Sequence, residues 1–92
     1  MITAIVFVQC QTDKILEVAE QIVELDGVGE VYSVTGDVDL IVVVRVSSME
    51  QVADVISDRI SKVFGVTQTV THLAFKTYSK RDQEEAFAIG GI

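Results

Sequence analysis

Residues 34–46 read Val-Thr-Gly-Asp-Val-Asp-Leu-Ile-Val-Val-Val-Arg-Val, and the rest of the chain is organised around them. Gly36 is followed closely by Asp37 and Asp39, and glycine supplies the positive φ that a tight turn commonly needs. The run after this turn is apolar and β-branched, which is typical of a strand buried on both faces. Two carboxylates at the end of such a strand indicate a site that contacts a small molecule or another surface.

Three more strands are predicted around this run. Residues 28–35 alternate between apolar and polar side chains, and the short turn makes them an antiparallel hairpin with residues 39–46. Residues 2–10 form a first strand that is apolar on both faces at its centre. Residues 66–78 form a long last strand, in which Thr67, Thr69 and Thr71 share one face.

The first of two predicted helices follows the first strand. Thr12 or Asp13 caps its start, and it runs to about Leu25, with Gly27 in the usual C-terminal position for a glycine. Its apolar side chains follow helical spacing and predict a buried face. The members of this face are Ile15, Leu16, Ala19, Ile22 and Val23.

The second predicted helix follows the 39–46 strand. It begins with a capping box, which is Ser47 with Glu50 or Ser48 with Gln51, and it is closed by Gly65. A spacing of three and four residues again predicts one buried face. That face carries Met49, Val52, Ile56, Ile60 and Val63.

The predicted element order is β-α-β-β-α-β. Right-handed crossovers then give an α+β, ferredoxin-like fold over residues 1–78, a four-stranded antiparallel sheet with two helices on one face, followed by a tail over residues 79–92. The other face of the sheet has no cover within one chain, although Ile5, Phe7, Ile41 and Val43 indicate that both faces are apolar. We therefore expect a dimer that forms through this face of the sheet.

Composition limits the classes of function. Ninety-two residues make one domain, and a hydrophobic fraction of 49% is more than one small core hides, so an oligomer is expected. A net charge of −7 without a basic patch argues against direct nucleic-acid binding. No apolar stretch reaches the roughly 18 residues that span a bilayer. We expect a cytoplasmic protein without a membrane segment.

The reactive side chains do not form a catalytic or metal-binding motif. His72 is the only histidine and has no partner at metal-ligand spacing, and the single cysteine, Cys10, lies in an apolar strand. Asp82, Glu84 and Glu85 are typical of a solvated charge run. The sequence therefore predicts no enzyme, no cofactor and no metal.

Asp37 and Asp39 allow two interpretations. Glycine and aspartate favour turns for local hydrogen-bonding reasons, so the pair is explained by turn chemistry alone. Alternatively, the threonine hydroxyls, the backbone N–H groups beside Gly36 and a carboxylate together hold a zwitterion. Residue types do not decide between these two interpretations.

Three segments resemble a known family. Gly27-Val28, the segment Val31–Leu40 with its V-x-G-x-x-D-L turn, and the G-V-x-x-T-x-T start of the last strand at Gly65–Thr71 are similar to the effector-binding domain of the Lrp/AsnC (leucine-responsive, feast/famine) regulators. The resemblance covers residues 1–78. It implies a domain that dimerises through its sheet, assembles into rings of dimers and binds amino acids between dimers.

Carried onto this sequence, the resemblance implies ligand contacts at Gly36, Asp37, Asp39, Thr69 and Thr71, with Thr35 and Thr67 as weaker candidates. Family members usually carry a DNA-binding helix-turn-helix before this domain, whereas this chain starts at the first strand. A stand-alone form is therefore expected, which senses an amino acid or related metabolite and co-assembles with full-length Lrp/AsnC regulators. The alternatives are a small enzyme on a dimeric αβ-barrel fold and an ACT-like amino-acid-binding domain.

Overall fold

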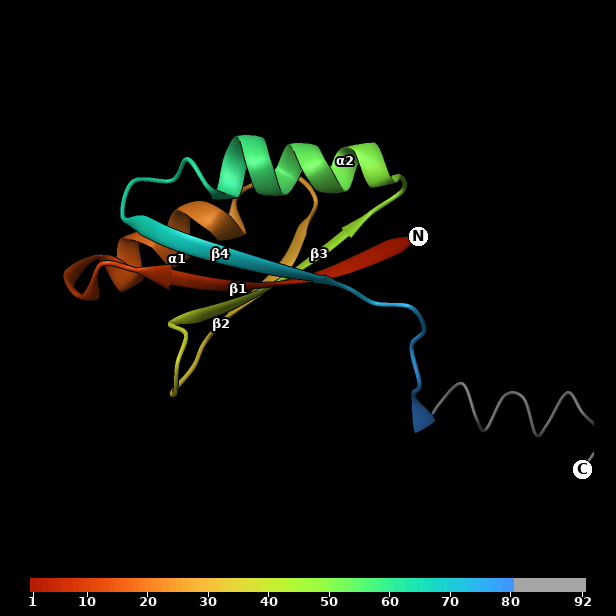
Figure 1. The fold of residues 1–92 in the computed structure, drawn as a ribbon, viewed down its shortest axis with the longest axis horizontal. Helices are drawn as coiled ribbons and strands as arrows, with labels where there is room; N and C mark the ends of the chain where they lie inside the picture. Colours follow the sequence, from red (N-terminus) through yellow and green to blue (C-terminus); the bar gives the residue numbers. More distant parts are fainter. Residues whose placement is uncertain (81–92) are drawn as a thin grey trace, which may run out of the picture.

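A computed structural model describes residues 1–80 of the chain. Its strands and helices follow the predicted order (Figure 1). The elements are the strands β1 (Ile2–Cys10), β2 (Val28–Ser33), β3 (Leu40–Val46) and β4 (Val66–Leu73), the helices α1 (Ile15–Val23) and α2 (Met49–Ala53), the 3-10 turn η1 (Thr12–Lys14) and the π-helical stretch η2 (Asp54–Ile60).

The four strands form one antiparallel sheet in the order β2-β3-β1-β4. Both helices cover the same face of this sheet (Figure 1). The ferredoxin-like fold predicted from the sequence is therefore confirmed. The central pair is β1 and β3, in register from Ile2 opposite Val46 to Val8 opposite Leu40.

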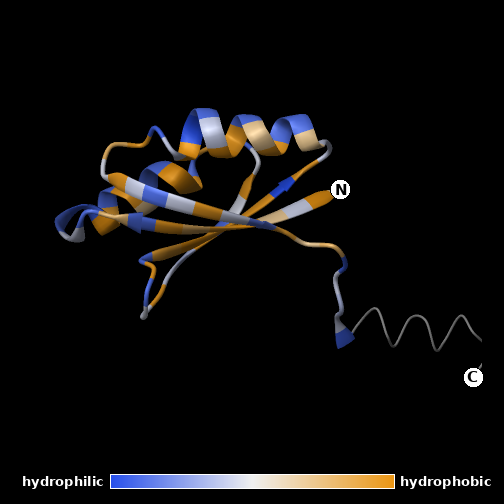
Figure 2. Cartoon of the chain, viewed as in Figure 1, coloured by the Kyte–Doolittle hydropathy of each residue, from blue (hydrophilic) through white to orange (hydrophobic). Residues whose placement is uncertain are grey.

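The core lies between the sheet and the helices. Alternate residues of β1 and β3 point toward the helices and are almost completely buried, because a strand turns successive side chains to opposite faces. Figure 2 shows hydrophobic and hydrophilic residues alternating along both helices, as expected for helices with one buried face. The buried residues are Ala4, Val6, Val8, Cys10, Leu40, Val42 and Val44 from the sheet, and Val18, Ile22, Val52, Val55 and Ile60 from the helices.

The first helix differs from the prediction at its start and at its edges. Thr12 and Asp13 lie inside η1, and no side chain caps η1 or α1. Leu16 is 66% exposed and Val23 is 46% exposed, whereas Val18 is fully buried. The buried stripe is thus narrower than predicted, and it is centred on Val18 and Ile22.

The second helix begins as predicted and then changes its winding. The Ser48 side chain accepts a hydrogen bond from the Gln51 backbone N–H at 3.2 Å, so the predicted cap at Ser48 is confirmed. The second bond of the predicted capping box differs, because the Gln51 side chain accepts from the Ser47 N–H and not from that of Ser48. After Ala53 the backbone adopts π-helical winding, and the Ser61 N–H donates to the Ile56 carbonyl five residues earlier at 3.0 Å. No sequence pattern predicted this change.

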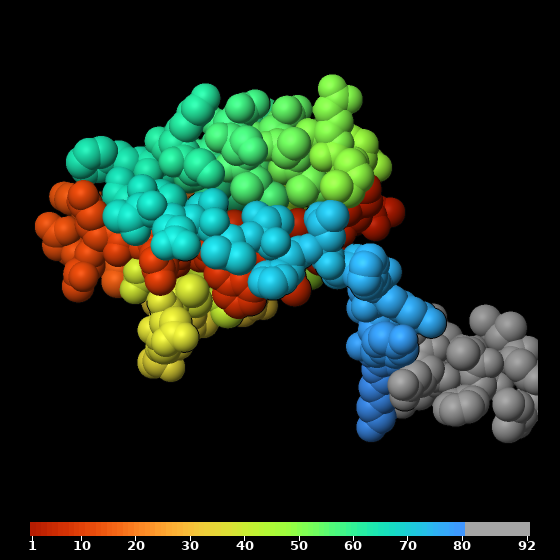
Figure 3. All heavy atoms as spheres, viewed as in Figure 1, coloured from red at the N-terminus to blue at the C-terminus, as the bar shows by residue number. Residues whose placement is uncertain are grey.

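The last strand is shorter than predicted. The predicted strand extended to residue 78, but β4 ends at Leu73, and the Ala74 N–H donates to the Thr3 carbonyl at 2.9 Å. Since β1 begins at Ile2, little of it remains for β4 to pair with beyond this point. The chain then leaves the body of the domain (Figure 3). Phe75, in this segment, is fully exposed. The predicted tail and its acidic run lie outside the described residues, apart from residues 79 and 80.

The open face of the sheet is apolar at its centre. Phe7 lies opposite Ile41 on one side and Val70 on the other, so these three side chains share this face. The His72 ring meets the Phe7 ring edge-on, with 5.2 Å between centroids. Val70 is 45% exposed, and no described element covers it. No helix within residues 1–80 is long and apolar enough to cross a membrane.

Candidate functional site

The turn between β2 and β3 protrudes from the body of the molecule, where Figure 3 shows it as a yellow lobe. Gly36 has a φ of 111°, as the sequence predicted for a tight turn, and a side chain placed there would have no heavy atom within 4 Å. The turn is closed by a hydrogen bond of 3.1 Å from the Val34 N–H to the Asp39 carbonyl. Its tip is therefore open to solvent while its base is fixed.

The end of β1 anchors this turn through three further hydrogen bonds. The Asp39 N–H donates to the Val8 carbonyl at 3.0 Å, and the Gln9 side-chain amide donates to the Asp37 carbonyl at 2.9 Å. The Cys10 N–H donates to Oδ2 of Asp39 at 2.9 Å. The turn is thus held on β1 by backbone and side-chain contacts together.

The two aspartates have different surroundings. Asp39 is half-buried and its carboxylate is occupied by the Cys10 N–H. The Asp37 carboxylate is exposed and forms no hydrogen bond or ion pair with the described residues. Asp39 has a structural contact in this chain, and Asp37 is the carboxylate of the turn that is free to contact a ligand.

Asp39 also acts on the Cys10 thiol. Burial raises the pKa of this thiol above its usual value, and the negative charge of Asp39 and a hydrogen bond to its side chain raise it further. A reactive cysteine needs a lowered pKa, so this thiol is not activated as a nucleophile. Within residues 1–80, no three His, Cys, Asp or Glu side chains are grouped so as to hold a metal ion.

The threonine row is not next to the turn within one chain. Thr69 pairs with Val8 and Thr71 with Val6, so both hydroxyl-bearing side chains lie on the helix-covered side of the edge strand β4. Leu40, the first residue of β3, pairs with Val8 on the other side of β1, so turn and threonines are two strand spacings apart, or about 10 Å. The structure therefore does not bring them together in a single subunit.

Thr71 lines a groove of about 350 Å³ between β4 and the second helix. The groove is mostly apolar, and none of the turn residues contributes to it. Thr35 and Thr67, the two weaker candidates, are exposed in the turn and at the start of β4. The groove is lined by Met49, Val52, Ala53, Ile56, Ser57, Thr71 and Leu73.

Sequence similarity decides the family of this chain. Residues 3–84 match the sequence model of the Lrp/AsnC ligand binding domain. The chain belongs to the Lrp/AsnC family. This assignment confirms the resemblance in the turn and the last strand, and it separates the chain from ACT domains of the same element order.

Relatives of this Lrp/AsnC domain include the HTH-type transcriptional regulator PH1916 of Pyrococcus horikoshii, which is 40% identical over 78 residues. The alignment covers 82% of this chain and 52% of that regulator, so the chain spans about half the length of the curated relatives it matches. The regulator YugG of Bacillus subtilis is 44% identical over 62 residues, which are 67% of this chain and 37% of YugG. Relatives named as regulators favour a regulatory module over an enzyme.

Solved structures agree with the fold of this Lrp/AsnC domain. TTHA0845 from Thermus thermophilus superimposes with a TM-score of 0.82 at 41% identity, over 87% of this chain and 100% of that one. The regulator NMB0573 of Neisseria meningitidis, solved in complex with L-Met, superimposes with a TM-score of 0.77 at 16% identity, over 85% of this chain and 52% of that one. The second likeness shows the fold alone.

Sequence reasoning missed the residues that hold the turn. Gln9 and the Cys10 N–H each reach a turn residue that is at least 28 positions away in the chain. A polar residue at the end of an otherwise apolar strand, as Gln9 is, was the one available signal. The contact of the Cys10 backbone N–H had no signal in the sequence, because every residue except proline has such a group.

Proposed function

We propose that this chain is a regulatory module of the Lrp/AsnC type that binds an amino acid or a related small metabolite at a boundary between subunits. It has no catalytic role, and it modulates transcription by co-assembly with regulators that read DNA. The geometry of the turn carries the proposal, because β1 holds its base while the Gly36 backbone and the Asp37 carboxylate remain open.

Carboxylates bind ammonium groups, and backbone N–H groups and hydroxyls bind carboxylates. Asp37 supplies the first kind of contact, and Gly36 together with Thr69 and Thr71 supplies the second. We assign Asp39 to holding the turn, in addition to any contact that it makes with the ligand. The amino-acid class also agrees with the L-Met complex of NMB0573, which has the same fold.

The separation of the two sets of residues supports a site between subunits. The turn and the threonines are about 10 Å apart across β1 in one chain, too far for one small amino acid to bridge comfortably. A second subunit that brings its own β4 to the turn would complete the site. Apolar residues exposed on the open face of the sheet are the surface through which we expect the first dimer to form.

Calorimetry against each of the common L-amino acids, with light scattering on the same samples, tests this function. We expect heat with at least one amino acid, a change in assembly mass on binding, and loss of this change in mass in Asp37→Asn. Asp13→Asn is the matched control, because Asp13 is also an exposed carboxylate but lies in η1, outside the turn.

The amide in Asp37→Asn keeps the size of the side chain and removes its charge, so the variant isolates the ionic contact. Absence of heat with every amino acid, together with an unchanged mass, would overturn the sensing function. An equal change in mass in Asp37→Asn and in the unaltered chain would remove Asp37 from the site.

A further inference from the structure

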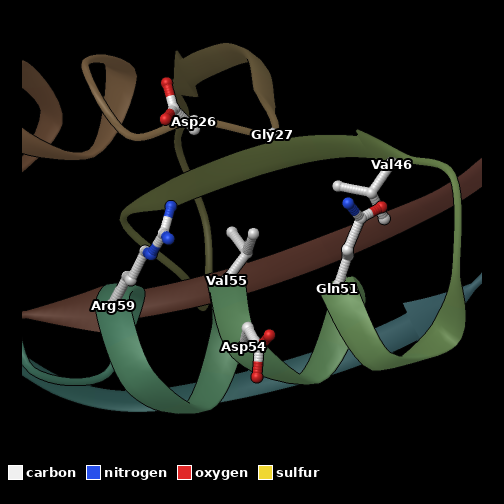
Figure 4. Close-up of a pocket in the computed structure, with 7 residues that line it drawn as sticks. All are labelled: Asp26, Gly27, Val46, Gln51, Asp54, Val55 and Arg59. Atoms are coloured by element: carbon white, nitrogen blue, oxygen red, sulfur yellow. The ribbon is translucent and has the colours of Figure 1, made fainter.

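A second cavity lies on the helix side of the molecule, away from the turn. Its volume is about 300 Å³, at the lower end of the range for small-molecule sites. It is bounded by the chain that joins α1 to β2, by the end of β3 and by the second helix (Figure 4). The lining residues are Asp26, Gly27, Val46, Gln51, Asp54, Val55 and Arg59, none of which was a candidate in the sequence.

One wall is a column of three side chains at intervals of four residues. Gln51, Val55 and Arg59 point into the same space in Figure 4. In a regular α-helix each step of four residues turns the side chain about 40° further around the axis. The π-helical stretch η2 has more residues per turn, which reduces this drift and keeps Arg59 in the column. Such stretches are rare and often occur at functional sites.

The polar groups of this wall are hydrogen-bond donors. Oε1 of Gln51 accepts from the Ser47 N–H at 2.9 Å and from the Ser47 hydroxyl at 2.7 Å, so the orientation of the amide is fixed. Its NH₂ end and the Arg59 guanidinium have no hydrogen-bond or ion-pair partner among residues 1–80. The two donors lie about two helical turns apart, with Val55 between them, so they serve different parts of a ligand. The guanidinium is the donor that suits a carboxylate, because its N–H groups match the two carboxylate oxygens.

The opposite wall offers an acceptor. Asp26 comes from the chain before β2, and its carboxylate has no ion pair or hydrogen bond within the described part of the chain. Asp54 also lines the cavity, but its carboxylate points away from Asp26 in Figure 4. An ammonium group fits against Asp26 for the same reason that a carboxylate fits against Arg59.

The floor between the two walls is apolar and shaped by a glycine. Gly27 has a φ of 93°, and a Cβ there would lie 2.9 Å from Cγ1 of Val46 and 3.0 Å from Cγ2 of Val55. The chain therefore approaches the two valines closely, and their methyl groups form the surface between the charged walls. An aliphatic or small side chain is the matching ligand part.

We propose that this cavity is a binding site for a small zwitterion of the α-amino-acid class, with its carboxylate on Arg59 and its ammonium on Asp26. A simple anion would meet two carboxylates, and a simple cation would meet the guanidinium. The site lies within one subunit, shares no residue with the turn, and does not depend on the assembly.

Nitrogen–proton correlation NMR tests this site directly, because the Gln51 side-chain NH₂ and the Arg59 Nε–H report on it. The chain is titrated with the common L-amino acids, and each binder is compared with the carboxylic acid that lacks its amino group and the amine that lacks its carboxylate. We expect shifts at both reporters, and binding at least about tenfold weaker for each analogue, since each loses one charge-assisted contact.

Arg59→Gln and Asp26→Asn are each expected to weaken binding at this site by about tenfold or more, read from the remaining reporter. Lys62→Gln and Asp58→Asn are the matched controls, because both residues are exposed near the end of the same helix and do not line the cavity. Asp37→Asn in the turn is expected to leave these shifts unchanged, which separates this site from the proposed function.

Three results would overturn the site. They are no shift at Gln51 or Arg59 with any amino acid, equal affinity in Arg59→Gln, and binding of the deaminated acid as tight as that of the amino acid.

Discussion

Asp39 shows how a single side chain connects the turn to the sheet. Its carboxylate accepts the N–H of Cys10, which is partly buried, and its own N–H binds the Val8 carbonyl. Asp39→Ala removes an acceptor that no other described group replaces. We expect a loss of about 1–2 kcal/mol in the free energy of unfolding, measured by urea denaturation.

Asp37→Ala is the control for this change. Asp37 belongs to the same turn, but its carboxylate is exposed and has no described partner, so we expect its effect to stay within about 0.5 kcal/mol. If both alanine variants unfold at the same urea concentration, the Asp39–Cys10 contact does not contribute to stability.

Ionisation of Cys10 makes the free energy of unfolding depend on pH, with a sign that follows from the pKa shift. Burial and the neighbouring Asp39 raise the pKa of its thiol in the folded state. The unfolded chain therefore loses this proton first, near the usual thiol pKa of about 8.5. The contribution of the protonated Cys10 thiol to the free energy of unfolding is complete below that pH. It is lost as the pH rises through the higher pKa of the folded state.

Urea denaturation at about pH 7 and about pH 10, on either side of the usual thiol pKa, checks this expectation. The unaltered chain should lose more stability between the two values than Cys10→Ala, which has no thiol to ionise. An equal loss in both proteins would assign the pH dependence to other groups.

At the scale of single residues, the sequence predicted the required backbone conformation better than it predicted contacts between distant residues. The turn at Gly36 was predicted from residue type, and its positive φ is confirmed. The bond between Asp39 and Cys10 spans 29 positions and depends on strand register, which one sequence does not reveal. The same limit applies to Arg59, since its place in a cavity depends on Asp26 from another element.

The start of the second helix is the element whose prediction is most directly testable. The Ser48 hydroxyl satisfies the Gln51 N–H, one of the N–H groups that a helix start leaves without a partner. Ser48→Ala is expected to cost about 1 kcal/mol in the free energy of unfolding, measured by thermal or urea denaturation. Ser57→Ala, an exposed serine later in the same helix, should change it by less than about 0.5 kcal/mol.

If Ser48→Ala is as stable as Ser57→Ala, the two bonds from Ser47 to Gln51 are sufficient to hold the start of this helix. That result would also predict that the Gln51 side-chain amide keeps its orientation when the Ser48 hydroxyl is removed.

Element boundaries differed from the predictions where a neighbour decides them. The prediction for β4 followed its alternation to residue 78, but the strand ends at Leu73 where its partner β1 runs out. In the second helix, regular spacing predicted the burial of Ile60 correctly and missed Val55. The type of helix and the length over which two strands pair are determined by the packed structure. The local sequence pattern contains little information on either property.

For the whole molecule, the fold followed from element order because few topologies connect two such crossovers in one sheet. The uncovered face was also predicted, since β1 and β3 are apolar at positions that point away from the helices. In the structure, these positions share the open face with Val70 and Tyr32, which are 45% and 52% exposed. A single sequence does not show which surface covers these exposed residues.

We expect a second copy of the chain to cover this face, and Val70→Lys tests that expectation. Val70 lies opposite Phe7 at the centre of the face and is not part of the core, so lysine is tolerated in a single subunit. Within a dimer interface, the same change places an ammonium group among apolar side chains and leaves it without a partner. Light scattering should therefore give a mass near that of one chain, 10.1 kDa.

Leu16→Lys is the matched control, because Leu16 is 66% exposed but lies on α1, on the other side of the sheet. It should keep the mass of at least two chains, as the unaltered protein should. Both variants must also show the circular dichroism of the folded chain, since a loss of mass through unfolding would have a different cause. A folded Val70→Lys variant that remains dimeric would move the contact between subunits away from the open face and onto the helices or the sheet edges.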